Sequence, residues 1–228
     1  HILITHTHCD HSPAARALQA ATGAKTYGYG PHGSGRAEDC TGVGIATEEG
    51  ADHEFAPDIA LRDGDSVAAP GWRLAAVETP GHTSNHLCFH LAEENTVFTG
   101  DHVMGWSTSV IAPPDGDMAA YLRSLEKLLG REDALYRPTH GAEILDPRPY
   151  VRAFIAHRHE RTAAILARLA AGDETIPAIV RAVYQGLDPR LRGAAGRSVL
   201  ANLIALVEES RVAADGPPRL DARYRLAR

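Results

Sequence analysis

The 228 residues of this chain are 44% hydrophobic and carry a net charge of −6, which is typical of a globular protein with a core of its own. No apolar run is long enough to span a bilayer, which excludes a membrane-spanning protein. The three cysteines are too few and too widely spaced for a disulfide framework. These features favour a cytoplasmic protein with no membrane partner.

The first predicted element is a buried strand over residues 2–4, which ends just before a polar motif. Residues 6–11 read His-Thr-His-Cys-Asp-His, so three imidazoles and one carboxylate fall within six positions. Ser12 is then an N-cap residue and Pro13 is the proline favoured at the first helical position, which predicts a helix that ends near Gly23. The motif therefore lies on a strand-to-helix loop, where side chains can converge on one point.

A short strand over residues 25–27 precedes a glycine-rich stretch that runs from residue 28 to about residue 57. A loop of that length inside a compact domain is usually functional or disordered. His32 and His53 lie in this stretch, and we interpret them as solvated loop histidines in preference to substrate contacts.

The next segment is predicted to form strands joined by short turns, in an order typical of a meander within one sheet. One strand leads to His82 and a later one leads to Asp101. An amphipathic helix capped by Asp115 or Asp117 then precedes a strand that leads to His140. The predicted strands cover residues 58–67, 72–77, 86–91, 96–99 and 134–136.

Seven side chains at the ends of these strands are candidate metal ligands. Histidine and carboxylate together suit a borderline cation, above all zinc, and seven such groups exceed one tetrahedral site. They suit two ions that share a bridging carboxylate. Two further histidines, His86 and His102, either orient these ligands or are satisfied core histidines. The seven candidates are His6, His8, Asp10, His11, His82, Asp101 and His140.

The order of these residues resembles that of the metallo-β-lactamase-fold hydrolases, in which His-x-His-x-Asp-His is followed by a lone histidine, a bridging aspartate and a last histidine. The resemblance implies an α+β fold, the αββα sandwich. Several strands normally precede the motif there, so we expect this chain to be N-terminally truncated. By the same resemblance Asp101 bridges two zinc ions, and Cys9 is a small neighbour of the ligands. It assigns the first ion to His6, His8 and His82, and the second to Asp10, His11 and His140.

The sequence changes character after Asp146. Three predicted helices are followed by a hairpin, an order that suggests a winged-helix arrangement. This tail resembles the C-terminal winged-helix domain of the β-lactamase-like protein 2 branch of the same family. We therefore predict a catalytic domain over residues 1–148 and a winged-helix-like domain over residues 149–228. The predicted helices cover residues 149–171, 175–184 and 196–210, and the hairpin covers residues 212–226.

The implied reaction is hydrolysis by a hydroxide that bridges two zinc ions, with Asp10 and Asp101 as the catalytic carboxylates. The bond would be an ester, thioester or related bond of a small-molecule or carrier-bound acyl substrate. Residues 151–228 carry 13 arginines against 8 acidic residues, which allows an anionic partner, although solvated arginine-rich faces are the simpler interpretation. Two alternatives stay open, an endoribonuclease on single-stranded RNA and a non-enzymatic, metal-dependent nucleic-acid-binding protein. The sequence leaves the oligomeric state open.

Overall fold

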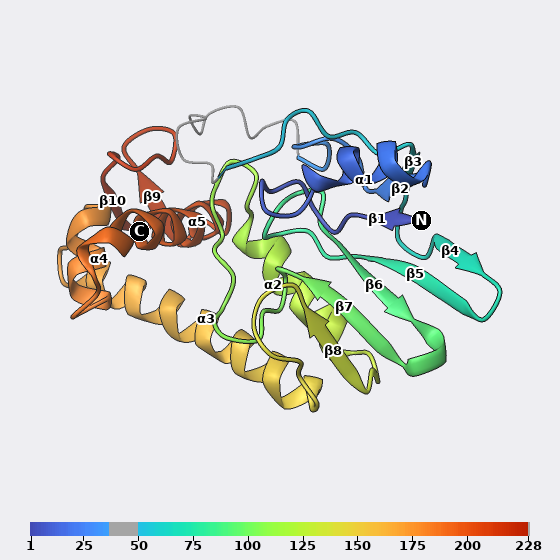
Figure 1. Ribbon diagram of the computed structural model, residues 1–228. Coiled ribbons are helices and arrows are strands. Elements are labelled where there is room, and N and C mark those ends of the chain that lie inside the picture. Colours follow the sequence, from blue (N-terminus) through green and yellow to red (C-terminus); the bar gives the residue numbers. More distant parts are fainter. Residues whose placement is uncertain (37–49, 228) are drawn as a thin grey trace.

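The computed structural model describes residues 1–36 and 50–227, and its N-terminal strands form a small parallel sheet (Figure 1). The strand order is β1-β2-β3, and helix α1 connects β1 to β2. Gly23 ends the helix with a positive φ of 69°, a conformation that glycine adopts without steric cost. The two predicted strands and the predicted helix are therefore confirmed. The bounds are β1 Ile2–Leu3, α1 Ala14–Thr22, β2 Thr26–Gly28 and β3 Ile59–Ala60.

Ser12 does not cap helix α1, contrary to the sequence prediction. Its hydroxyl donates a 2.7 Å hydrogen bond to the Asp52 carboxylate, which lies 40 residues further along the chain. The helix begins without a side-chain cap, with Pro13 at its N-terminal boundary. Ser12 thus bonds to a residue distant in sequence, and the predicted hydrogen bond to the first turn of α1 does not form.

The larger sheet has the strand order β4-β5-β6-β7-β8. The strands from β4 to β7 pair antiparallel, as the predicted meander requires, with Val77 opposite Cys88 and Phe89 opposite Phe98. Strand β8 pairs parallel to β7 because helix α2 carries the chain back between them. The bounds are β4 Ser66–Ala69, β5 Trp72–Glu78, β6 Leu87–Leu91, β7 Thr96–Gly100, α2 Met118–Leu129 and β8 Leu135–Pro138, with a short 3-10 turn over Ala92–Glu94.

Of the two candidate caps of helix α2, Asp117 is the one used. Its carboxylate accepts a 2.9 Å hydrogen bond from the backbone N–H of Ala120. The predicted apolar face is confirmed, since Tyr121, Leu125 and Leu128 are at most 1% exposed.

Three apolar clusters show that the layers are stacked helix, sheet, sheet and helix. Ile2, Ile4, Ala15 and Phe55 join the small sheet to helix α1. A second cluster lies between the two sheets and contains Leu61, Val67, Ala76, Leu87 and Phe89, with Leu3 and Tyr27 packed against it. A third joins the far face of the larger sheet to helices α2 and α3 through Val77, Cys88, Val97, Tyr121, Leu125 and Phe154. This is the predicted αββα arrangement.

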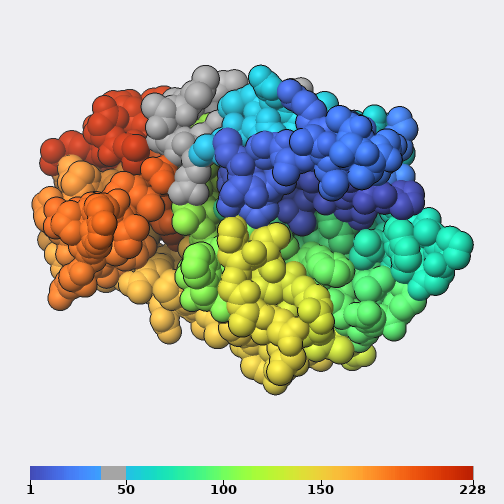
Figure 2. Space-filling model, viewed as in Figure 1, coloured from blue at the N-terminus to red at the C-terminus, as the bar shows by residue number. Residues whose placement is uncertain are grey.

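The C-terminal region lies at the opposite end of the molecule from the N-terminal strands (Figure 2). It consists of three helices and an antiparallel hairpin, which confirms the predicted winged-helix order. Helix α3 crosses the predicted boundary after residue 148: Val151 and Phe154 pack in the core against the larger sheet, and Ile165 and Leu169 pack in the C-terminal core. The position of that boundary stays a prediction. The bounds are α3 Pro147–Ala170, α4 Ile176–Val183, α5 Arg192–Glu208, β9 Val212–Ala214 and β10 Tyr224–Leu226, with a 3-10 turn over Pro189–Leu191 before α5.

Among the described residues, no helix has both the length and the apolar character needed to cross a membrane.

Candidate metal centre

The seven candidate ligands come from four loops that meet at one end of the paired sheets. The first loop follows β1, and the others follow β5, β7 and β8. Two glycines let these loops approach neighbouring backbone closely. A Cβ on Gly81 would lie 2.3 Å from the backbone of Tyr121, and one on Gly141 would lie 2.5 Å from the backbone of Gly105. Both glycines have a positive φ, so the side chains next to them, His82 and His140, depend on glycine for their placement.

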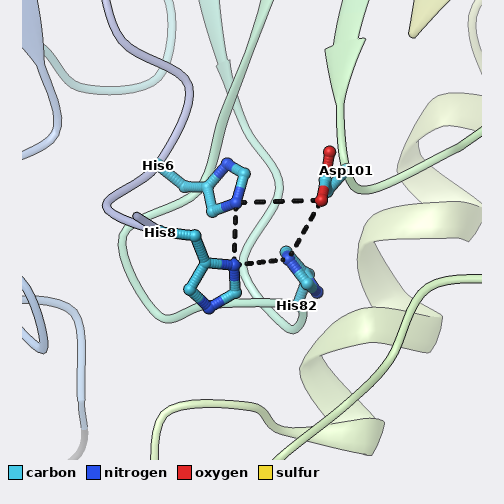
Figure 3. A group of neighbouring side chains, drawn as sticks. All are labelled: His6, His8, His82 and Asp101. Carbon is cyan, nitrogen blue, oxygen red and sulfur yellow. Dashed lines mark hydrogen bonds and ion pairs between the residues drawn. The ribbon is translucent and has the colours of Figure 1, made fainter. Parts of the chain in front are cut away.

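The first group contains His6, His8, His82 and Asp101, whose ligand atoms all lie within 4.8 Å of one another (Figure 3). His8 Nδ1 is 3.0 Å from His6 Nε2 and 3.1 Å from His82 Nε2. Asp101 Oδ2 completes the group at 4.0 Å from His6 Nε2 and 3.6 Å from His82 Nε2. Three imidazole nitrogens and a carboxylate oxygen thus point toward one place.

The second group contains Asp10, His11 and His140. His140 Nε2 is 3.2 Å from Asp10 Oδ2, and His11 Nε2 is 3.4 Å from Asp10 Oδ1. Asp101 Oδ1 faces this group, at 3.5 Å from His11 Nε2 and 3.6 Å from His140 Nε2. The two carboxylate oxygens of Asp101 therefore face two different ligand groups.

Burial favours the neutral form of two imidazoles of the first group, His6 and His8. The pKa of His6 lies well below its usual value because the ring is buried and the neighbouring histidines oppose its protonation. Burial and His82 lower the pKa of His8 to about 4. Burial alone would raise the pKa of Asp101, but the His11 and His82 imidazoles and the Thr139 hydroxyl outweigh it, so that pKa lies well below the usual range. Neutral imidazoles around an ionised carboxylate are the donors that a divalent cation needs.

The second group also fits a cation. His11 Nε2 is buried and has no hydrogen-bond partner among the described residues. A buried ring nitrogen that makes no hydrogen bond costs free energy, and a bound ion would offset that cost. This nitrogen, which faces carboxylate oxygens of Asp10 and Asp101, and the mixed nitrogen and oxygen donors of both groups fit divalent metal ions.

Two contacts orient the candidate ligands. His82 Nδ1 lies 2.7 Å from the backbone carbonyl of Val110, which can only accept, so Nδ1 carries the proton and Nε2 presents its lone pair to the group. The backbone N–H of Asp101 donates a 3.2 Å hydrogen bond to His86 Nε2, and His86 Nδ1 is 2.8 Å from the Thr79 hydroxyl. His86 therefore orients the Asp101 backbone, one of the two roles considered for it.

His102 fits neither of the two roles considered for it. Both of its ring nitrogens are buried without a hydrogen-bond partner among the described residues, so it is not a satisfied core histidine. Its ring packs 4.6 Å from the ring of Tyr121, and burial lowers its pKa to about 3. The imidazole is a neutral packing group.

His32 is not the solvated histidine that its loop position predicted, because its side chain is only 3% exposed. Its Nδ1 lies 3.0 Å from the Thr7 hydroxyl, and its Nε2 lies 2.9 Å from Arg36. Arg36 in turn donates a 2.9 Å hydrogen bond to Asp115, 79 residues away. His53 is exposed, as predicted. Residues 37–49 of the glycine-rich stretch lie outside the described residues.

A cavity of about 610 Å³ opens beside the two groups. One side carries candidate ligands and Cys9, which belongs to neither ligand group among the described residues. The other side comes from the loop after β7 and carries Met104, Trp106, Ser107 and Val110. This wall was not predicted from the sequence. The available signal was Trp106, a lone tryptophan five residues after Asp101 between a glycine and a serine.

Comparison with known proteins identifies both regions. Residues 1–140 match the model of the metallo-beta-lactamase superfamily, and residues 175–219 match that of the beta-lactamase associated winged helix domain. A metallo-beta-lactamase family protein of Thermus thermophilus is 28% identical, with a TM-score of 0.65 over 77% of this chain and 56% of that one.

Two curated relatives come from fungi. The lactamase-like protein adaB of Aspergillus niger is 29% identical over 96% of this chain and 66% of its own length. The atrochrysone carboxyl ACP thioesterase of Paecilomyces divaricatus is 34% identical over 63% of this chain and 38% of its own length. This chain thus spans about two thirds or less of the length of these relatives. With its matching fold and its two His and Asp groups, the chain belongs to the metallo-beta-lactamase superfamily, and a beta-lactamase associated winged helix domain follows its catalytic region.

Proposed function

We propose that this protein hydrolyses a thioester of a small-molecule or carrier-bound acyl group, with two zinc ions held by the seven His and Asp side chains. The observation that carries the proposal is the position of Asp101. Its Oδ2 faces His6 and His82, and its Oδ1 faces His11 and His140. A carboxylate shared in this way is what a dinuclear site requires.

The side chains have separate roles in this proposal. Histidine-rich donor sets suit zinc, with His6, His8 and His82 holding one ion and Asp10, His11 and His140 holding the other. Once bound, such ions polarise a carbonyl oxygen and lower the pKa of water toward neutrality. Asp101 offsets the charge of both sites. Asp10, whose side chain is 62% exposed at the cavity, is placed to accept a proton and release it to solvent.

Two observations favour an acyl substrate over RNA. One relative is named as a thioesterase of an acyl carrier protein. The described residues that line the cavity include neither Lys nor Arg, although a phosphodiester substrate calls for cationic side chains. Several arginines of the C-terminal region already pair with carboxylates, as in Arg168–Asp173, Arg190–Asp188, Arg219–Asp221 and Arg223–Glu174.

We place the protein in the cytoplasm. Cys9 is exposed and Cys88 is buried, and both are free thiols, a state that a reducing compartment maintains. Burial raises the pKa of Cys88 to about 12, so this thiol is unreactive.

The test compares wild type with Asp101→Ala, using zinc content and turnover of an acetyl thioester and of a short unstructured RNA. We expect two zinc ions per chain and thioester turnover in the wild type. Loss of the bridge removes several kcal/mol of transition-state stabilisation, so Asp101→Ala should lower turnover by about three orders of magnitude.

Asp133→Ala is the matched control, because Asp133 is also buried but pairs with Arg131, away from the centre. It should leave zinc content and turnover unchanged. Full turnover by zinc-loaded Asp101→Ala would refute the dinuclear mechanism, and turnover of RNA alone would refute the thioester assignment.

A further inference from the structure

Trp106 is unusually exposed for a residue beside a metal centre. Its side chain is 71% exposed, although tryptophan usually buries most of its surface. Its ring lies parallel to the ring of His140, with a centroid separation of 5.9 Å and an interplanar angle of 10°. The indole is therefore parallel to the His140 ring and mostly open to solvent.

The backbone of Trp106 is held in place. The N–H of Gly105 donates a 2.8 Å hydrogen bond to the carbonyl of His140, and Gly105 and Gly141 form a parallel bridge. A Cβ on Gly141 would lie 2.8 Å from the backbone nitrogen of Trp106, so the two segments pack tightly. The backbone that carries the exposed indole is therefore fixed against the loop that carries His140.

The chemistry of the cavity indicates which class of ligand this surface binds. Met104, Trp106 and Val110 give one wall an apolar character, and the candidate metal ligands form the other. A volume of about 610 Å³ is in the range of small-molecule sites. An indole could also stack a nucleobase, but the exposed Asp10 carboxylate and the absence of Lys and Arg among the described lining residues disfavour the attached phosphates.

We propose that this wall is an acyl subsite for a planar, conjugated acyl group, which stacks on the exposed indole of Trp106 while its carbonyl points to the metal centre. The inference rests on the proposed thioester hydrolysis and adds the class of acyl group. Stacking of one aromatic ring on another adds about 1 kcal/mol to area burial, which corresponds to roughly a fivefold to tenfold gain in affinity.

The first experiment measures binding without turnover. The chain contains two tryptophans, so Trp72→Phe leaves Trp106 as the sole fluorescent indole. The zinc-loaded variant is titrated with two thioethers of N-acetylcysteamine, one bearing a naphthoylmethyl group and the other an acetonyl group, neither of which has a hydrolysable bond. We expect the naphthyl compound to quench Trp106 and the acetonyl compound to leave it unchanged. Equal responses, or quenching by a short RNA and not by the naphthyl compound, would overturn the proposal.

The second experiment measures selectivity, as the ratio of kcat/KM for 2-naphthoyl and acetyl thioesters of N-acetylcysteamine. Trp106→Ala should lower this ratio about tenfold, mainly through KM of the naphthoyl substrate, and Trp106→Phe should restore most of it. Leu145→Ala is the matched control, because Leu145 is 74% exposed but lies outside the lining of the cavity.

An unchanged ratio, or an equal loss for both substrates together with a loss of zinc, would show that Trp106 only shields His140. If the wild type cleaves neither substrate, thioester hydrolysis fails, and the binding experiment still decides the subsite.

Discussion

The catalytic region and the C-terminal region bury different kinds of side chain. Around the candidate metal centre, His6, His82, His86, Asp101 and His102 are all less than 9% exposed. In the C-terminal region the buried side chains are almost entirely apolar, and among the described residues Arg158 and Asn202 are the buried polar exceptions.

The two regions therefore gain their stability in different ways. Burial of apolar surface stabilises the C-terminal core directly. The polar groups at the metal centre lose solvation on burial and recover it only through partners. The buried Nε2 of His11 lies 3.4 Å from Asp10 and 3.5 Å from Asp101 and makes no hydrogen bond among the described residues, so a bound ion would complete its interactions. We therefore expect the order of the centre to depend on bound metal and that of the C-terminal core to be independent of it.

The first prediction concerns metal removal, which should have the largest effect and should act on the metal centre and not on the C-terminal core. An ion present at about 1,000 times its Kd stabilises the folded state by about 4 kcal/mol. Amide hydrogen exchange with and without a chelator should show faster exchange in the four ligand loops when metal is removed. Exchange should be unchanged in α4, whose buried residues all lie in the C-terminal core. In Asp101→Ala the chelator should have a smaller effect. A uniform change over the whole chain would contradict the comparison.

The second prediction concerns the apolar core. Leu200 is fully buried in α5, so Leu200→Ala should lower the free energy of unfolding by about 2–5 kcal/mol through the cavity it leaves. Leu191→Ala is the control, since Leu191 is 53% exposed, and it should cost less than about 0.5 kcal/mol. Denaturant titration measures both. Zinc content should stay at the wild-type value, and a loss of zinc in Leu200→Ala would show that the two regions are energetically coupled.

The sequence predicted that these seven side chains converge because their signal is local. Residues 6–11 carry four of them within six positions. Each of the other three, His82, Asp101 and His140, follows a strand that can be predicted from its apolar residues. Strand ends meet at one end of paired sheets, so this placement could be inferred without knowledge of any contact. Whether these side chains bind metal stays a prediction.

The errors concern residues whose partners lie far away in sequence. Ser12 looked like a cap, but its partner Asp52 becomes available only when the chain folds. His32 looked solvated, because Asp115, to which Arg36 connects it, lies 79 residues beyond Arg36 in the sequence. Trp106 was missed for the same reason: its role depends on a bridge between residues 105 and 141. Local patterns predict elements, whereas long-range hydrogen bonds decide which polar residues are buried.

The third prediction concerns the pH dependence of stability, for which we expect the smallest effect. The pKa of His8 is lowered from 6.5 to about 4 by burial and by His82, so between these values the unfolded chain binds a proton that the folded chain does not. Stability of the metal-free protein should therefore fall as the pH falls through this window, by about 1.4 kcal/mol per pH unit for each such imidazole. His8→Asn should reduce the difference between denaturation midpoints measured at about pH 6.5 and about pH 5.5. His159→Asn should not, because His159 is an exposed residue of α3. If both variants keep the wild-type difference, the buried imidazoles of the centre are not the source of its acid sensitivity, and the contrast between a polar and an apolar core loses its thermodynamic basis.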